Sequence, residues 1–250
     1  MKPQAPTPIL CLSETWRIFG WSQLIHVIQG AARFLARPTL QKFPVTAPIL
    51  TRLMAAWPMS SPIRVLFLFL FLTSLRLSSV LPSAYPFTFK PLFHLSWANL
   101  SFTTEGVLIT ILKSKTIICL ERSLSFFVPA HSSPSVCLVQ HLTSLRSNVN
   151  YPSSPTDPVF SLAAKGSWVP MTRRNTNPTF WRCLSSLGLD PKVFGWSSFR
   201  RGSASEYLVK TGDVELLRIH GDWKSSIYQK YLAIPPERRS RVITTLQSMI

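Results

Sequence analysis

Acidic side chains are scarce in this sequence. Only 10 of its 250 residues are Asp or Glu, against 27 Lys and Arg, so the formal net charge is +17. Glu14 is the only acidic residue before Glu105. A soluble chain with this excess of positive charge usually faces a polyanion, and nucleic acid is the commonest one. We therefore expect a nucleic-acid partner, and an anionic membrane surface is the competing interpretation.

Cysteine is also sparse and widely spaced. The four cysteines form no CxxC pair and no Cys/His cluster, which argues against a zinc site and against a disulfide framework. We expect buried free thiols in a reducing compartment. The positions are Cys11, Cys119, Cys137 and Cys183.

Long apolar runs are missing as well. The run VLFLFLFL, Val65 to Leu72, is only eight residues long and ends at Thr73 and Ser74. A membrane span needs about 20 apolar residues. The N-terminus has no apolar core long enough for a signal peptide. The run therefore predicts a fully buried helix of a packed core.

Hydrophobic periodicity, caps and turn residues predict a mainly helical α+β domain with a small antiparallel sheet. Short β-branched and aromatic runs predict three or four strands, in the segments LSWANLSFT, GVLITILK, TIICL and SLSFFVP. NVNYPSSPTDP is expected to be a loop. Helices are expected at 13–37, 46–57, 60–81, 136–147, 171–187, 198–211 and 213–220, and one more carries Tyr228 and Tyr231.

Five separated segments carry a resemblance. They are FLTSLRLSSVLP, LSWANLSFTTEGVLITILKSKTI, LSSLGLDP, GWSSFRRGSA and HGDWKSSIYQKYL. In this order and spacing the chain resembles the catalytic domain of tyrosine recombinases (the phage-integrase family), and it is most similar to those of eukaryotic DIRS-like retroelements. The resemblance covers about residues 29–235. It implies a catalytic domain at 45–250, preceded at 1–44 by a linker and a remnant of the helical core-binding domain.

The resemblance also implies a reaction. A tyrosine hydroxyl attacks a DNA phosphodiester, which leaves a 3′-phosphotyrosyl link and a free 5′-hydroxyl, and another DNA end reverses the step. The implied role is DNA recombination and integration for a mobile element, in the nucleus. Double-stranded DNA is the implied partner, with homo-oligomers on DNA and no membrane partner. No cofactor or metal is implied, so protein groups must stabilise the charge on the phosphoryl oxygens.

Two arginines and one lysine match the family's phosphate-handling residues. Arg76, in SLRLSSVLP, and Arg200, in SSFRRGS, match the two catalytic arginines, whose planar forks suit phosphate oxygens. Lys115, in ILKSKTI, matches the general acid of the β-hairpin. Without the resemblance, Arg76 would be read as a surface arginine at the end of a buried helix. Lys115 would be read as a solvated turn charge.

The nucleophile is expected at Tyr231, with Tyr228, one helical turn earlier, as its competitor. Trp223 matches the position where the family carries His or Trp, and its indole N–H suits a phosphate oxygen. Core packing is the alternative role for Trp223. His220 is a weaker candidate for the same role.

Three further basic residues are expected to contact DNA rather than to take part in the chemistry. Arg201 follows Arg200 directly, Lys113 would share a strand face with Lys115, and Lys224 follows Trp223. Two arginines at the start of a helix are unusual, because the positive end of the helix dipole disfavours cations. Their presence there indicates that an anion binds between them.

One catalytic position departs from the family pattern. Ser197 stands where the His-x-x-Arg box has histidine, and serine cannot carry a positive charge or shuttle a proton near neutral pH. We therefore expect a slowed or absent chemical step with DNA binding kept. The alternatives are a catalytically inactive DNA-binding remnant of a mobile-element recombinase, and an open reading frame without function.

Overall fold

The apolar run of the sequence forms the central helix of the fold. In the computed structural model, which describes residues 41–82, 89–114, 117, 123–223 and 229, helix α4 spans Pro62–Thr73. Nearly every side chain from Ile63 to Leu70 is buried. A helix that is apolar on all sides belongs in a core. Within the described part of the chain, no helix has the length and apolarity that crossing a membrane would require.

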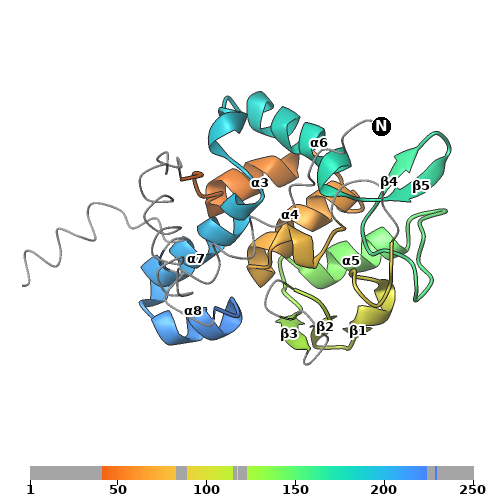
Figure 1. Cartoon of the computed structure of the whole chain (residues 1–250), viewed down its shortest axis with the longest axis horizontal. Coiled ribbons are helices and arrows are strands. Elements are labelled where there is room, and N and C mark those ends of the chain that lie inside the picture. Colours follow the sequence, from red (N-terminus) through yellow and green to blue (C-terminus); the bar gives the residue numbers. More distant parts are fainter. Residues whose placement is uncertain (1–40, 83–88, 115–116, 118–122, 224–228, 230–250) are drawn as a thin grey trace, which may run out of the picture. The chain divides into compact units, whose positions relative to one another are not determined.

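Three helices pack around α4 (Figure 1). They are α3 (Ala47–Ala55), α5 (Leu138–Arg146) and α7 (Ser197–Thr211). The predicted start of α3 is confirmed, with Thr46 at the N-cap and a proline in the first turn. The chain divides after Gln41, and the described residues from Lys42 onward belong to one unit. The helices expected at 13–37 and around Tyr228 and Tyr231 lie outside the described residues.

Helix α4 ends earlier than its sequence suggests. The expectation of a helix as far as Leu81 is wrong, because Ser74 adopts a left-handed conformation with φ of 51° and closes the helix after Thr73. An extended turn through Arg76 and a short 3-10 helix, η1 (Leu77–Ser79), follow. The local sequence carries no Gly or Pro at this point, so long-range contacts of Ser74 decide where the helix ends.

The expected antiparallel sheet is confirmed for three strands. Strands β1 (Leu100–Phe102), β2 (Gly106–Ile111) and β3 (Leu124–Pro129) pair in the order β1-β2-β3, after the 3-10 helix η2 (Trp97–Asn99). Alternate residues of β2, including Val107, Ile109 and Ile111, are buried in the core. The expected strand TIICL falls almost entirely outside the described residues.

A second, two-stranded sheet was not expected from the sequence. Strands β4 (Ser161–Ala164) and β5 (Ser167–Pro170) form a hairpin. The two residues of its turn, Lys165 and Gly166, both have positive φ, at 49° and 79°. Such a turn matches the twist of antiparallel strands. The hairpin follows the 148–158 segment, which is a loop as predicted.

The C-terminal helices begin and end at the predicted signals. Thr172 caps α6 (Arg173–Ser186) through a capping box, and Asp213 caps α8 (Val214–His220) by accepting from the Leu216 N–H. Gly212 ends α7 with φ of 76°. Pro178 lies inside a continuous α6. A short 3-10 helix, η3 (Pro191–Val193), joins α6 to α7. The α+β class is confirmed.

An aromatic cluster fixes α6 and α7 onto the central helix. The Phe67 ring of α4 lies 5.3 Å from Phe199 of α7 and 5.7 Å from Phe180 of α6, and Trp196 packs against all three. Burying each such ring contributes about 1.5–3 kcal/mol. Since Phe199 precedes Arg200 directly, this cluster fixes the backbone that carries the arginine.

Candidate nucleic-acid interface

Four basic side chains from distant parts of the sequence line one cavity of about 370 Å³. They are Lys42, Arg76, Arg173 and Arg200. We call this cavity the basic pocket. None of its lining residues is acidic, so the like charges raise the potential inside it and favour an anion. The remaining lining residues are Leu77, Ser78, Leu81, Pro82, Gly195, Trp196 and Ser197.

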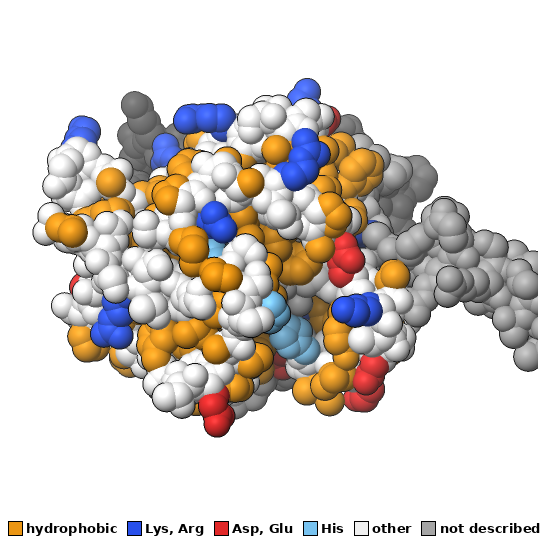
Figure 2. Space-filling model, turned by 180° about the vertical axis from the view of Figure 1, so that it is seen from behind, with side chains coloured by type: hydrophobic (Ala, Val, Ile, Leu, Met, Phe, Trp, Pro, Cys, Tyr) orange, Lys and Arg blue, Asp and Glu red, His pale blue; other side chains and the backbone are white. Residues whose placement is uncertain are grey.

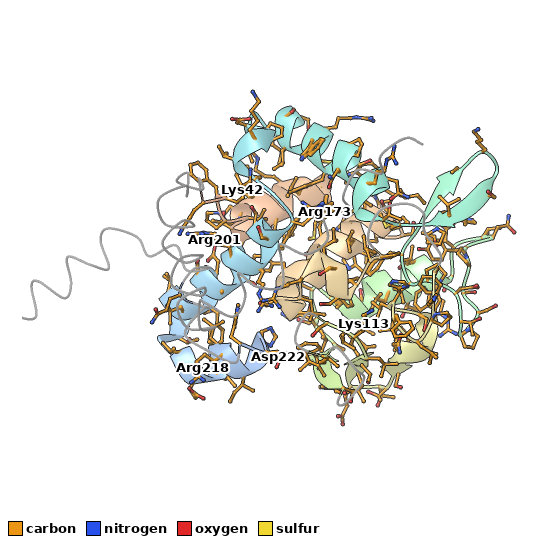
Figure 3. The ribbon with its side chains drawn as sticks, in the orientation of Figure 1. Lys42, Lys113, Arg173, Arg201, Arg218 and Asp222 are labelled. Carbon is orange, nitrogen blue, oxygen red and sulfur yellow. The ribbon has the colours of Figure 1, made fainter. Side chains whose placement is uncertain are left out.

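Each cation of the basic pocket comes from a different element. Lys42 precedes α3, Arg76 lies in the turn after α4, Arg173 begins α6 and Arg200 lies near the start of α7. Figure 3 labels Lys42 and Arg173, both in the region of α3, α6 and α7. Ser197, the first residue of α7, is exposed at this pocket. The first turns of α6 and α7 contain no acidic residue that would offset the positive ends of the helix dipoles. These helix ends therefore add to the positive potential of the basic pocket.

Arg200 is held from three directions. Its side chain is only 2% exposed. Nη1 donates to the Ser74 carbonyl, and Nη2 donates to the Gly221 carbonyl at 2.7 Å. Its guanidinium carbon lies 4.0 Å from the centre of the Trp223 ring, a cation–π distance. These contacts hold the arginine rigidly at the wall of the basic pocket, so little side-chain entropy remains to be lost when an anion binds.

The stacking of Trp223 on Arg200 depends on a glycine. A Cβ atom on Gly221 would lie 1.8 Å from the Trp223 ring, which is far inside van der Waals contact. The missing side chain lets the chain after α8 fold back, so that Trp223 is buried at 4% exposure against Arg200. Arg200 and Trp223, two of the predicted site residues, therefore lie in contact, and both suggested roles of Trp223, packing and site, are compatible with this arrangement.

The N-terminal half of α7 is seated against the segment before α3. The Val45 N–H donates to the Ser198 carbonyl at 2.9 Å. A Cβ atom on Gly202 would lie 1.7 Å from the Val45 carbonyl oxygen. This close backbone approach brings Lys42, three residues before Val45, to the basic pocket.

The other predicted residues in the described part lie outside the basic pocket. Arg201 is partly buried, and burial lowers its pKa from the ordinary value. Lys113 is exposed beside the three-stranded sheet (Figure 3), with Nζ 4.7 Å from the centre of the Phe93 ring. The structure therefore does not bring Lys113 to Arg76 and Arg200.

His220 is near Arg200 but does not line the basic pocket. Its Nε2 is 3.0 Å from the Leu72 carbonyl, at the end of α4. Burial, and then the nearby Arg200 charge, lower the pKa of His220. A neutral imidazole that donates to Leu72 suits a structural role. Four predicted site residues lie outside the described residues: Lys115, Lys224, Tyr228 and Tyr231.

Sequence reasoning missed two cations of the basic pocket. Arg173 could have been found from the sequence, because it lies in the first turn of a predicted helix that has no acidic residue there. Arg200 lies in a similar position near the start of α7. Lys42 carried no such signal, because it stands in a stretch that reads as a basic linker. The pairing of the 43–45 backbone with Val193 and Ser198 places it, and its Nζ donates to the Lys192 carbonyl.

Basic side chains are dispersed over one face of the described residues. On the face shown in Figure 2, Lys and Arg side chains are scattered among acidic, polar and apolar ones and do not merge into one continuous patch. Of four cavities in the described residues, the basic pocket has the most Lys and Arg in its lining.

Comparisons with known proteins identify the fold. No protein-family model matches the sequence, and no curated protein does. Among solved structures, the XerH site-specific recombinase bound to palindromic difH substrate aligns with a TM-score of 0.56 at 16% identity, over 85% of this chain and 56% of that one. The Tn1549 transposon integrase in complex with circular intermediate DNA aligns with a TM-score of 0.54 at 13% identity, over 89% of this chain and 75% of that one.

A third neighbour, the XerA recombinase, aligns with a TM-score of 0.50 at 13% identity, over 92% of this chain and 77% of that one. The chain thus spans little more than half of the XerH recombinase chain in the first alignment. At these identities the likeness establishes the fold alone. The described unit has the mainly helical α+β fold of tyrosine recombinases and integrases.

Proposed function

We propose that this chain binds duplex DNA as a tyrosine-recombinase-like protein of a mobile element, with the basic pocket on the DNA backbone. The observation that carries the proposal is the meeting of Arg76 and Arg200 with Lys42 and Arg173 in one cavity without an acidic lining residue. Arginine forks bind phosphate oxygens in pairs. The recombinase fold and the DNA complexes named for XerH and the Tn1549 integrase support the same partner.

The proposed chemistry follows from the residues that match the family. Arg76 and Arg200 hold the scissile phosphate and stabilise the charge that builds on its oxygens. The Tyr231 hydroxyl gives its proton to solvent water, and its oxygen bonds to phosphorus. The bond to the 5′-oxygen breaks, and Lys115 supplies the proton that the leaving oxygen takes up. Recombination and integration in the nucleus, for a DIRS-like element, complete the proposal.

Lys42 and Arg173 have a different role in this proposal. Both are exposed, whereas Arg200 is buried, so they lie at the entrance of the basic pocket. We assign them to phosphates next to the one held by Arg200. Each neutralised phosphate releases a counterion and steepens the dependence of affinity on salt by about 0.9 in log–log slope.

DNA binding is tested by titrating labelled duplex at several salt concentrations. Arg76→Ala and Arg200→Ala should each weaken binding and reduce the salt slope by about one contact. Arg218→Ala is the matched control, because it removes the same charge from a partly exposed residue that is paired with Glu215 on α8 and does not line the basic pocket. Equal losses in all three variants would indicate general charge attraction and would refute a specific pocket.

A catalytically inactive DNA-binding protein is the second candidate function. Ser197, exposed at the basic pocket in place of an imidazole, favours it. Removing a general acid–base group costs about 10²–10⁴-fold in rate. Incubation of the wild-type protein with supercoiled plasmid, without added metal, should therefore give weak relaxation or none. If only the missing imidazole slows the reaction, Ser197→His should increase the amount of a covalent protein–DNA adduct, and Tyr231→Phe should abolish that adduct. If Ser197→His binds DNA and still forms no adduct, the protein is a catalytically inactive DNA-binding protein.

A further inference from the structure

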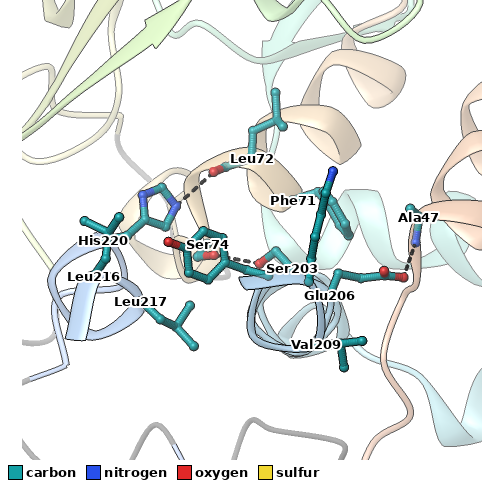
Figure 4. A pocket seen from close by; sticks show the side chains of 12 residues that line it. Ala47, Phe71, Leu72, Ser74, Ser203, Glu206, Val209, Leu216, Leu217 and His220 are labelled. Carbon is teal, nitrogen blue, oxygen red and sulfur yellow. Dashed lines mark hydrogen bonds between the residues drawn. The ribbon is translucent and has the colours of Figure 1, made fainter. Parts of the chain in front are cut away.

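Two serines, Ser74 and Ser203, contact Arg200 but do not line the basic pocket. Ser74 Oγ and Ser203 Oγ lie 2.6 Å apart, as the dashed line in Figure 4 marks. Ser74 is 1% exposed and directly follows α4, whereas Ser203 lies on α7, three residues after Arg200. The pair therefore joins the end of the central helix to the helix that carries the arginine.

The direction of these hydrogen bonds follows from the acceptors nearby. Ser203 Oγ lies 3.3 Å from the Arg200 carbonyl oxygen, which can only accept. A hydroxyl has one proton to donate. When Ser203 donates to that carbonyl, Ser74 must donate to Ser203. The two serines thus link the Ser74 turn to the backbone of Arg200 itself.

Ser74 needs this support because its backbone is strained. Its φ of 51° and ψ of 20° place it in the left-handed region, which is unfavourable for a residue with a Cβ atom. In that conformation its carbonyl accepts from Nη1 of Arg200. Relaxation to an ordinary conformation would turn the carbonyl away and leave that side of the guanidinium without its acceptor.

The Ser74 turn also borders open space. Ser74 and Ser203 both line a mainly apolar cavity of about 610 Å³ between α4, α7 and α8 (Figure 4). None of the four cations of the basic pocket lines this cavity. Close packing therefore does not surround the two serines on every side, and their hydrogen bonds add to the contacts that hold the turn.

We propose that Ser74 and Ser203 are positioning residues that keep the Arg200 guanidinium aimed into the basic pocket. The inference rests on the proposed function of that pocket. Ser74 acts through its carbonyl, which it can present only while it stays left-handed. Ser203 acts by holding the Ser74 hydroxyl. Neither serine touches the phosphate.

The test compares Ser74→Ala with Ser74→Gly, and Ser203→Ala with Ser203→Thr, in DNA titrations at several salt concentrations. Ser74→Ala keeps the strain and loses the hydroxyl, so affinity should fall about two- to tenfold, the factor that one hydrogen bond supplies. Ser203→Ala should match it. Ser74→Gly adopts positive φ freely and should stay within about twofold of wild type. Ser203→Thr keeps the hydroxyl and should do the same.

A structural role is separated by repeating Ser74→Ala and Ser203→Ala in the Arg200→Ala background. Positioning through Arg200 predicts no further loss of affinity there. A further loss of the same size, or wild-type affinity in both single alanine variants, would overturn the inference. Equal losses in Ser74→Gly and Ser74→Ala would overturn the part assigned to the strained turn.

A second measurement is independent of DNA. The guanidinium protons of Arg200 lie over the Trp223 ring, so their NMR signals should be displaced by the ring current. Ser74→Ala and Ser203→Ala should shift the Arg200 signals toward the chemical shifts of a free arginine, and Ser203→Thr should leave them unchanged. If Arg200→Ala binds DNA like wild type, the proposed function fails while this measurement still decides the positioning. Unchanged Arg200 signals in both alanine variants would refute the positioning alone.

Discussion

Gly202→Ala should destabilise the protein, although alanine is the better helix former. Gly202 lies in the middle of α7, where replacing glycine by alanine usually gains about 1 kcal/mol. Here the new Cβ atom would lie 1.7 Å from the Val45 carbonyl oxygen and 2.6 Å from its carbonyl carbon. Both are backbone atoms, so no side-chain rotation relieves the overlap.

The structure sets the size of the effect. A relieved contact needs a separation of at least 3.0 Å, so α7 and the Val45 segment must move apart by more than an ångström. Such overpacking costs about 1–3 kcal/mol. The hydrogen bond from the Val45 N–H to the Ser198 carbonyl, worth about 0.5–1.5 kcal/mol, is lost with it. After the propensity gain of about 1 kcal/mol, a net loss of about 0.5–3.5 kcal/mol remains.

Thermal unfolding followed by circular dichroism measures this. A loss of that size should lower the midpoint by roughly 1–14 °C for a unit of about 200 residues. Gly195→Ala is the control, since its Cβ atom would come no closer than 3.8 Å to a neighbour and its φ is not positive. It should be neutral or slightly stabilising. A higher midpoint for Gly202→Ala would refute the close approach of α7 to Val45, and with it the seating of Lys42.

Three further predictions concern other contacts. His141 is buried and neutral, with Nε2 accepting from Arg64 Nε at 3.0 Å, and burial lowers its pKa. Protonation of His141 therefore favours the unfolded chain, so the stability that the neutral imidazole contributes above about pH 6.5 is lost as the pH falls. The difference between the urea midpoints at pH 7.5 and pH 5.5 should be smaller in His141→Gln than in wild type. Gly221→Ala should displace the Trp223 ring and weaken DNA binding to the level of Trp223→Ala, which a titration of the two variants compares. Glu206 accepts the first N–H of α3, a helix without an acidic residue in its own first turn, so Glu206→Gln should lower the free energy of unfolding in urea by about 0.3–1 kcal/mol.

Local sequence signals predicted the ends of helices well wherever a capping residue sets them. Helices α6 and α8 begin after the N-cap residues Thr172 and Asp213, and α7 ends at Gly212, as these residue types suggest. These signals act over three or four residues and need no partner from elsewhere in the chain. The apolar run likewise identified the buried helix, because apolarity on all sides leaves a helix no solvent face.

The end of α4 and the hairpin β4–β5 were not predictable in this way. Ser74 adopts a conformation that glycine usually supplies, and it is held there by Arg200 and Ser203, more than 120 residues later in the chain. The hairpin has short strands of four residues, and its turn is Lys165-Gly166 rather than a common Asn-Gly. Neither feature has a local signature strong enough to read.

The same division applies to the site. Composition and motifs are enough to establish the net positive charge, the residue types suited to phosphate and the presence of Ser197 in the SSFRRGS motif. The folded structure is needed to show that Lys42 and Arg173 join Arg76 and Arg200 in one pocket, and that Lys113 does not line it. Charges from four elements meet only through backbone packing, above all through the close approach of α7 to Val45, and no single stretch of sequence encodes that contact.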